Sequence, residues 1–201
     1  MAKPSGNCLD GARTPAERGG AAGYDGPLLG HATQPVERGL VMETINVIVE
    51  IPRGSQNKYE YDHEAHTIKL DRHLIVSMGY PAEYGFIPDT LGGDGDPLDA
   101  LVLTEYPTFP GCLIEAKILG MCIMTDENGE DAKILAVPAY DPKWKSATDI
   151  GDVPKDVLDR ISHFFTVYKD LDEGKWMKVE NWVGRDDALR ELEASRSRYP
   201  G

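Results

Sequence analysis

Residues 94–103 read Asp94-Gly95-Asp96-Pro97-Leu98-Asp99-Ala100-Leu101-Val102-Leu103, an acidic loop that runs directly into an apolar segment. Gly95 allows a tight turn and Pro97 stiffens the backbone, while the apolar run predicts a strand that anchors the loop to a core. Three carboxylates this close repel one another unless cations lie among them. Their oxygens suit Mg²⁺, Mn²⁺ or Ca²⁺ rather than zinc, which prefers His or Cys. The stretch therefore predicts a rigid metal-binding loop, with a solvated acidic turn as the alternative.

A second acidic turn, Asp126-Glu127-Asn128-Gly129-Glu130-Asp131, lies just before Lys133. Two such turns suggest one shared site. A third candidate is Glu50, which interrupts the apolar strand pattern of residues 47–52. Alternation places Glu50 on the face opposite its apolar neighbours, so it is either a site carboxylate or simply an outward-facing strand residue.

Basic and phenolic side chains accompany these acids, although a calcium-binding loop would not need them. Each alone fits a solvated surface residue. Together, cations, tyrosine hydroxyls and metal carboxylates predict a site for a small, highly charged phosphate compound, because Arg and Lys hold oxyanions that metals also neutralise. The candidates are Lys58, Arg72, Lys133, Lys169, Tyr80, Tyr84 and Tyr168.

The order of elements predicts a mainly β fold with flanking helices. Several short strands separated by Gly, Pro, Asp and Asn suggest a small closed barrel. We expect strands at about 44–51, 58–62, 66–71, 100–104, 111–124 and 133–138.

A helix is expected after these strands, with Asp152 as its N-cap and Pro154 in its first turn. Apolar residues from Val157 onward recur at helical spacing, so this helix should pack on the barrel and deliver Tyr168 and Lys169 at its end. A second helix, roughly 185–197, is charged on most of its surface and indicates no function.

Residues 1–42 differ in composition from the rest. They hold eight of the 21 glycines and four of the 14 prolines without a periodic apolar pattern, which predicts a disordered leader or tail before a single domain at 43–201. The segment has no continuous apolar core, so we expect neither a secretory signal nor a membrane anchor. Met42 could be the original start. The three cysteines show no metal spacing and favour an intracellular, cytoplasmic setting.

The formal charge of −13 argues against one class of partner. Residues 1–42 carry four basic and four acidic side chains, so all of the net charge belongs to the remainder. Nucleic acid would be repelled in the absence of a basic patch. An anionic substrate that arrives with metal ions is not excluded, because it would meet a local basic cluster.

Short motifs along the chain add a family resemblance. They are Glu50-Ile51-Pro52, Asn57-Lys58-Tyr59-Glu60, Leu70-Asp71-Arg72, Tyr80-Pro81, Tyr84-Gly85-Phe86-Ile87, Asp94-Gly95-Asp96-Pro97-Leu98-Asp99, Asp126 to Lys133, His163-Phe164-Phe165 and Tyr168-Lys169-Asp170-Leu171. In this order, over residues 44 to about 182, they resemble the family I soluble inorganic pyrophosphatases. The Asp-Gly-Asp-Pro-x-Asp element is highly specific for that family, and the version at residues 57–63 is similar to actinobacterial members.

The resemblance implies an OB-like five-stranded closed barrel, commonly a homohexamer in bacteria. It also implies an inorganic diphosphatase that splits pyrophosphate into two phosphates by direct attack of a metal-activated water, with several Mg²⁺ ions, or Mn²⁺, at each site.

The expected roles follow from the motifs and the resemblance together. Asp99 and Asp131 would hold a metal pair, with Asp94 completing the first metal, while Asp126 and Glu50 would bind metals that travel with the substrate. Asp96 is the preferred general base and Asp131 its rival. Phosphate oxygens would be held by Lys58, Arg72, Tyr84, Lys133, Tyr168 and Lys169. Glu60 would orient Lys58 or a bound water, and Tyr80 would support the base through a hydrogen bond.

Two other classes of protein stay open from the residues alone. In a calcium-binding module, Asp94, Asp96 and Glu105 would take positions 1, 3 and 12 of an EF-hand, but Leu98 replaces a ligand, Asp99 stands where glycine is needed, and strands flank the loop. A barrel that binds nucleic acid or a partner through its strands suits the acidic charge poorly. The histidines, including His63 and His163, fit structural roles better than catalytic ones.

Overall fold

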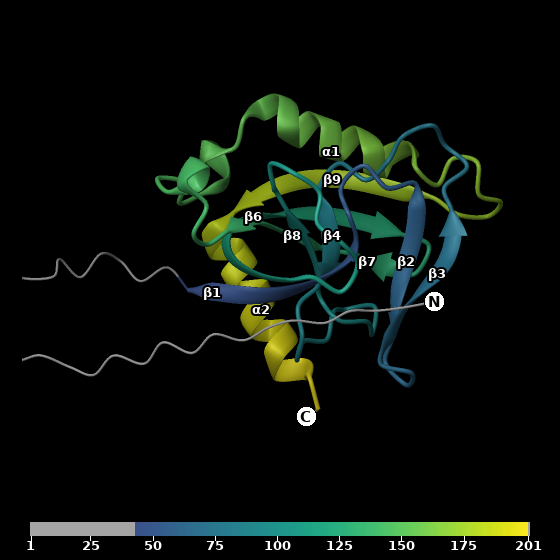
Figure 1. The fold of residues 1–201 in the computed structure, drawn as a ribbon, viewed down its shortest axis with the longest axis horizontal. Helices are drawn as coiled ribbons and strands as arrows, with labels where there is room; N and C mark the ends of the chain where they lie inside the picture. The colour runs from purple at the N-terminus through teal and green to yellow at the C-terminus, as the bar shows by residue number, and fades with distance from the viewer. Residues whose placement is uncertain (1–42, 201) are drawn as a thin grey trace, which may run out of the picture. The chain divides into compact units, whose positions relative to one another are not determined.

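The structure is a computed structural model that describes residues 43–200 (Figure 1). Strands make up its first two thirds, and the two α-helices follow later in the chain. The elements are β1 (Thr44–Ile51), β2 (Asn57–Asp62), β3 (Thr67–His73), β4 (Glu83–Phe86), β5 (Asp99–Val102), β6 (Leu113–Asp126), β7 (Gly129–Glu130), β8 (Lys133–Pro138), η1 (Pro142–Trp144), η2 (Ile150–Asp152), α1 (Lys155–Val167), β9 (Met177–Gly184) and α2 (Arg185–Arg198). Residues 1–42, predicted as a leader or tail, lie outside the described residues.

Five strands form a ring in the order β1-β4-β5-β8-β6, and β6 pairs back to β1. The β5–β8 pair is parallel and the other pairs of the ring are antiparallel. The second half of β6 extends past the ring, where it pairs with β9 and β7. The predicted five-stranded, OB-like architecture is confirmed, with β2 and β3 forming a separate hairpin beside the ring.

Alternation along the strands divides the apolar side chains between two clusters. In β8, Ile134 and Ala136 face one cluster, whereas Leu135 and Val137 face the other. The first cluster draws on β1, β5, β6 and β8 and is closed by Ala188 and Leu192 of α2. The second lies between the outer face of the sheet and α1. The core therefore holds the ring rigidly between two helices.

Helix α1 covers the sheet with Ile161, Phe164 and Phe165, which are all buried. The prediction that Asp152 caps this helix is wrong: its N-cap is Pro154, without a side-chain hydrogen bond. Asp152 instead closes the short η2 turn, where its carboxylate accepts the amides of Thr148 at 2.7 Å and Asp149 at 3.1 Å. The Asp152 carboxylate is therefore occupied by amides of the turn before α1, and Pro154 has no N–H that could donate to it.

Three strands of the sheet, β4, the two-residue β7 and β9, were not predicted. β4 contains Glu83, which is fully buried and accepts hydrogen bonds from Thr104 and Thr108. Because a charged residue interrupts the apolar pattern, the sequence did not indicate a buried strand here. Gly85 also weakened the strand signal, but it is required here: a Cβ at this position would lie 2.0 Å from the carbonyl oxygen of Ile48 on β1. The predicted second helix is confirmed as α2. No helix among residues 43–200 is long and apolar enough to cross a membrane.

Candidate active site

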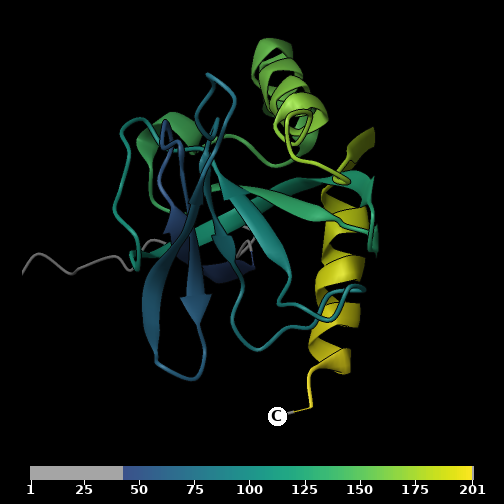
Figure 2. The same ribbon diagram turned by 90° about the vertical axis from the view of Figure 1, so that its right-hand side faces the viewer.

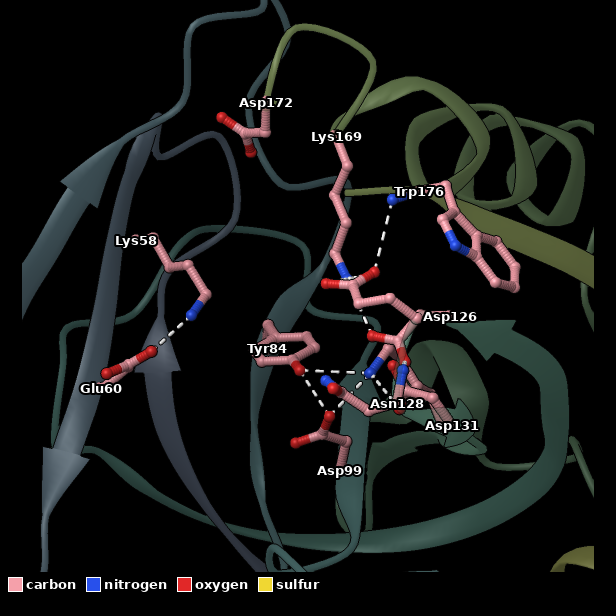
Figure 3. Close-up of polar contacts among 12 residues, drawn as sticks. Lys58, Glu60, Tyr84, Asp99, Asp126, Asn128, Asp131, Lys169, Asp172 and Trp176 are labelled. Carbon is pink, nitrogen blue, oxygen red and sulfur yellow. Dashed lines mark hydrogen bonds and ion pairs between the residues drawn. The ribbon is translucent and has the colours of Figure 1, made fainter. Parts of the chain in front are cut away.

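Lys133 is the centre of the first polar cluster. Since β5 and β8 run parallel with Asp99 opposite Lys133, their beginnings meet at the same edge of the sheet. The Lys133 side chain is only 2% exposed, and its Nζ lies 2.7 Å from Asp99 Oδ2, 2.8 Å from Asp131 Oδ1 and 3.2 Å from Tyr84 Oη. The Tyr84 hydroxyl donates to Asp99 Oδ2 at 2.5 Å. Figure 3 shows Tyr84, Asp99 and Asp131 converging on this point.

Charge and burial are opposed in this cluster. Burial disfavours the Lys133 ammonium, but Asp99 and Asp131 outweigh burial and raise the pKa of Lys133, which therefore stays charged. Burial, together with repulsion from Asp99, raises the pKa of Asp131 despite the attraction of Lys133. Burial also raises the pKa of Tyr84 well above its ordinary value, so this tyrosine remains a hydroxyl donor. One ammonium thus faces two carboxylates that it does not fully compensate.

A second cluster joins the end of α1 to the acidic turn after β6. Lys169 Nζ lies 2.8 Å from Asp126 Oδ2 and 3.4 Å from both carboxylate oxygens of Glu127. Glu127 also accepts the amide of Trp176 at 3.3 Å, and Asp126 accepts the amide of Asn128 at 2.8 Å. Burial alone would raise the pKa of Asp126, but the hydrogen bonds from Lys169 and Asn128 leave it lowered. Asp126 is therefore a charged oxygen donor at neutral pH.

The β2–β3 hairpin supplies a third group of charges. Lys58 and Arg72 are paired across the two strands, and Asp71 lies between their cationic groups, 3.4 Å from Lys58 Nζ and 2.8 Å from Arg72 Nη1. Glu60 accepts from Lys58 at 2.5 Å, and Asp172 accepts from Arg72 at 3.2 Å. Two cations are thus held on one face of the hairpin, and Figure 3 shows Lys58 and Glu60 lying apart from Tyr84, Asp99 and Asp131.

A pocket of about 290 Å³ separates the hairpin from the edge of the ring. Its lining includes Lys58 and Glu60 on one side and Tyr84, Asp96 and Asp99 on the other. Its size suits a small molecule.

Glu50 lines the same pocket, where its Oε1 accepts the Tyr61 amide at 2.7 Å. Burial, with a smaller contribution from the charge of Asp99, raises the pKa of Glu50 to about 7. Glu50 therefore faces the pocket, not the solvent.

Asp94 and Asp96 lie in the exposed loop before β5. Gly95 between them adopts the left-handed conformation, with φ of +94°, which makes the tight turn possible. The Asp96 amide donates to Asp94 Oδ1 at 3.1 Å. Partial burial and repulsion from Asp94 and Asp99 raise the pKa of Asp96. The Asp96 side chain thus lines the pocket as a carboxylate that binds a proton more readily than usual.

The two remaining tyrosines are buried among aromatic rings. The Tyr80 ring packs against Tyr84 at 5.3 Å between centroids and against Phe164 at 4.9 Å, while Tyr168 stacks on Phe164 at 5.2 Å. Among residues 43–200 no hydrogen bond joins Tyr80 to Asp96. The structure gives Tyr80 a packing contact beneath Tyr84 in place of the expected hydrogen bond.

Sequence analysis gave no role to Asp71, Glu127 or Asp172, although each contacts a predicted site residue, nor to Trp176, whose amide donates to Glu127. Glu127 lies inside the second acidic turn, so its charge and position could have indicated a contact with a site lysine. Asp71 is the neighbour of Arg72 on β3 and reaches Lys58 across the hairpin. Asp172 contacts Arg72 only because the loop after α1 comes to the hairpin, and Trp176 contributes only its backbone amide. Nothing in the sequence pattern shows those contacts.

The donor chemistry of the clusters fits a divalent cation. Within residues 43–200, no three Asp, Glu, His or Cys side chains converge closely enough to form a ready-made metal site. All the candidate ligands are carboxylate oxygens, the donors that Mg²⁺ prefers. Burial, with a smaller contribution from repulsion between carboxylates, raises the pKa values of Glu50, Asp96 and Asp131, and bound cations would favour their charged forms.

Comparisons with known proteins agree with this arrangement. The profile of a family described as inorganic pyrophosphatase matches residues 47–200. The inorganic pyrophosphatase of Streptomyces coelicolor is 53% identical over 154 residues, which are 77% of this chain and 94% of that protein. That of Thermus thermophilus is 50% identical over 161 residues, 79% of this chain and 92% of that protein.

Solved structures show the same similarity. The inorganic pyrophosphatase of Thermus thermophilus superposes with a TM-score of 0.77 at 48% identity, covering 81% of this chain and 95% of that one. A truncated vacuolar soluble pyrophosphatase of Trypanosoma cruzi, solved in complex with PPi, has a TM-score of 0.71 at 28% identity, covering 83% of this chain and 72% of that one. The matching profile, the identities and the shared fold together place this chain in the inorganic pyrophosphatase family.

Proposed function

We propose that this protein hydrolyses inorganic pyrophosphate to two phosphates in a Mg²⁺-dependent reaction. The observation that carries the proposal is one pocket bordered by carboxylates of β1 and of the loop before β5, by the Tyr84–Asp99–Lys133 cluster and by the cationic hairpin. Such a set suits a compact substrate with many negative charges that is bound together with metal ions. The name and bound PPi of the Trypanosoma relative support this substrate for this chain.

Five carboxylates are proposed to hold the metal ions. Asp99 and Asp131 come from different segments and lie within 2.8 Å of the same ammonium, so the two can share a cation. Asp94, Asp126 and Glu50 would complete the set. When bound, Mg²⁺, or Mn²⁺ in its place, lowers the pKa of water and neutralises phosphate oxygens.

The basic and phenolic side chains are proposed to bind the phosphate groups. Lys58 and Arg72, which pair with Asp71 and Asp172, would hold the phosphate nearer the hairpin. Lys133, Lys169, Tyr84 and Tyr168 would hold the other phosphate. Raised pKa values, which burial causes in both tyrosines, keep their hydroxyls as donors to the leaving phosphate.

Asp96 is proposed as the general base. It lines the pocket and forms no ion pair among the described residues, and its raised pKa makes it a better proton acceptor than an ordinary aspartate. Asp131 is the rival, but Asp131 already accepts a hydrogen bond from Lys133. No side chain needs to act as a nucleophile when water attacks directly.

Phosphate release from pyrophosphate tests the proposal. We expect turnover with Mg²⁺, none in excess chelator, and little with Ca²⁺, because Ca²⁺ is larger, tolerates irregular coordination and lowers the pKa of water less. Equal rates with Ca²⁺ and Mg²⁺ would contradict the proposed metal role. Ca²⁺ binding without turnover in Mg²⁺ would favour the calcium-binding alternative.

The two neighbouring carboxylates Asp96 and Asp99 have separable roles. Asp96→Asn should lower turnover by about 10²–10⁴-fold with Mg²⁺ affinity largely kept. Asp99→Asn should weaken Mg²⁺ binding and turnover together. If Asp96→Asn loses Mg²⁺ as severely as Asp99→Asn, or keeps near-native turnover, the base would be Asp131, or the metal-activated water would need no side-chain base.

We also propose, from the family resemblance, that the protein acts as a homohexamer in the cytoplasm. Sedimentation equilibrium should then give six times the 22.1 kDa mass of the chain. A monomer mass at micromolar concentration would reject the hexamer.

A further inference from the structure

The C-terminal helix α2 contacts the loop that carries Asp94 and Asp96. In Figure 2 the loop that follows β4 lies against this helix. The Leu91 amide donates to the carbonyl oxygen of Ser195 at 3.0 Å, and Arg198 Nε donates to the Leu91 carbonyl oxygen at 2.8 Å. Helix α2 therefore satisfies both backbone hydrogen-bonding groups of Leu91, at the point where the acidic loop begins.

Arg198 is itself held firmly. Its Nη2 donates to Glu191 Oε1 at 2.5 Å and to Ser195 Oγ at 2.8 Å, and the buried Ser195 hydroxyl also donates to Glu191 at 3.0 Å. The planar guanidinium thus serves three acceptors in a fixed orientation. Glu191 and Arg198 line a cavity of about 100 Å³ together with Asp94, Asp99 and Asp131, so this contact lies directly beside the proposed metal ligands.

The acidic loop has little else to fix it between Leu91 and Pro97. Residues 93–96 are all exposed. The hydrogen bonds inside the loop run from the Gly92 amide to the Asp96 carbonyl oxygen, from the Gly95 amide to the Gly92 carbonyl oxygen and from the Asp96 amide to Asp94. These bonds make the loop a compact unit. The other anchor is at its base, where Thr90 Oγ1 accepts the Leu98 amide. Movement at Leu91 would therefore displace Asp94 and Asp96 together.

We propose that Arg198 is a positioning residue for the metal-binding loop: by holding the Leu91 carbonyl it orders Asp94 and Asp96 before Mg²⁺ binds. This inference rests on the proposed function of these carboxylates. Without Arg198, the loop samples more conformations, and metal binding has to order it. Removing a contact that supports metal ligands from behind commonly lowers metal affinity by about 10–100-fold.

The test compares two arginines of one helix. Arg198→Met removes the guanidinium and keeps an apolar stem, while Arg196→Met is the matched control, because Arg196 pairs with Glu43 and not with the loop. Mg²⁺ affinity is measured by calorimetry on the full chain, and amide hydrogen exchange is followed for Leu91 and Asp96, with Leu135 of β8 as a core reference. Half-saturating Mg²⁺ for pyrophosphate hydrolysis is measured alongside.

We expect Arg198→Met to weaken Mg²⁺ binding by about tenfold, to speed exchange at Leu91 and Asp96 but not at Leu135, and to regain most of its turnover at saturating Mg²⁺. Arg196→Met should match the wild type. Arg198→Lys, which keeps the charge and one donor, should show a smaller shift, and it replaces Arg198→Met if that variant unfolds.

Unchanged Mg²⁺ affinity and loop exchange in Arg198→Met, or equal effects of both arginine variants, would overturn the inference. A loss of melting temperature with uniform acceleration of exchange would show a purely structural role and would also overturn it. Failure of the proposed function would be distinguishable from failure of this inference. In that case the wild type would release no phosphate, while Mg²⁺ binding and amide exchange would still show whether Arg198 orders the loop.

Discussion

Replacing Lys133 by methionine tests the charge balance on which the site depends. The Lys133 ammonium is buried and neutralises Asp99 and Asp131 at 2.7 and 2.8 Å, whereas Met fills similar space without charge. Removing one partner of a buried ion pair typically costs about 3–5 kcal/mol, because the remaining charges stay uncompensated. In the metal-free protein at pH 8 we therefore expect Lys133→Met to lose about that much free energy of unfolding.

The unfolding free energy that Lys133→Met loses should be smaller at low pH than at high pH. The folded-state pKa of Asp131 is already raised by burial, and it rises further without Lys133. A carboxylate whose pKa is raised in the folded protein destabilises it above that pKa, and this cost disappears as the pH falls and the group is protonated. The deficit should thus be smaller at pH 5 than at pH 8.

Urea unfolding with excess chelator at both pH values measures the effect. Lys143→Met is the control, because Lys143 forms an exposed ion pair with Glu105, and we expect its unfolding midpoint to stay close to that of the wild type. A loss below about 1 kcal/mol in Lys133→Met, or an equal loss at pH 5 and pH 8, would refute the reasoning.

Three further predictions follow from particular residues. In metal-free protein the wild type should lose about 3 kcal/mol of unfolding free energy between pH 4.5 and 7, because the pKa of Glu50 is raised to about 7 in the folded state. Urea titrations should show that Glu50→Gln removes this loss, and identical pH profiles of the two proteins would contradict the prediction. Gly85→Ala should destabilise by at least about 1–3 kcal/mol in thermal unfolding, since its Cβ meets the Ile48 carbonyl; a neutral result would reject the close approach. A chain that begins at Met42 should match the full chain in turnover and melting temperature, and a clear loss in either would assign residues 1–41 a part in the structure.

The strands and the acidic loop were predictable because their signals are local. The apolar runs after Pro97 and in β8 and the alternation in β1 follow from neighbouring residues. β4 could not be recognised, because its burial depends on partners elsewhere: Glu83 is satisfied by Thr104 and Thr108, and Gly85 by the approach of β1.

The site was predictable in residue types and less so in its contacts. The clustering of Asp and Lys in short turns is visible in the sequence, and the structure brings Asp99, Asp131 and Lys133 together. The contacts of Asp172 with Arg72 and of Arg198 with Leu91 join segments about a hundred residues apart. Helix α2 indicated no function because most of its surface is charged, whereas its contact with the acidic loop depends on one side chain at its end, Arg198.

Phosphate release from pyrophosphate, measured with saturating Mg²⁺ on the wild type and on Asp99→Asn and Glu180→Gln, tests the central claim most directly. Asp99 lies in the proposed site, whereas Glu180 on β9 pairs with Lys178 away from the pocket. The account predicts two phosphates released per pyrophosphate by the wild type and by Glu180→Gln, and a severe loss in Asp99→Asn. Absence of phosphate release by the wild type, or unchanged turnover in Asp99→Asn, would contradict it.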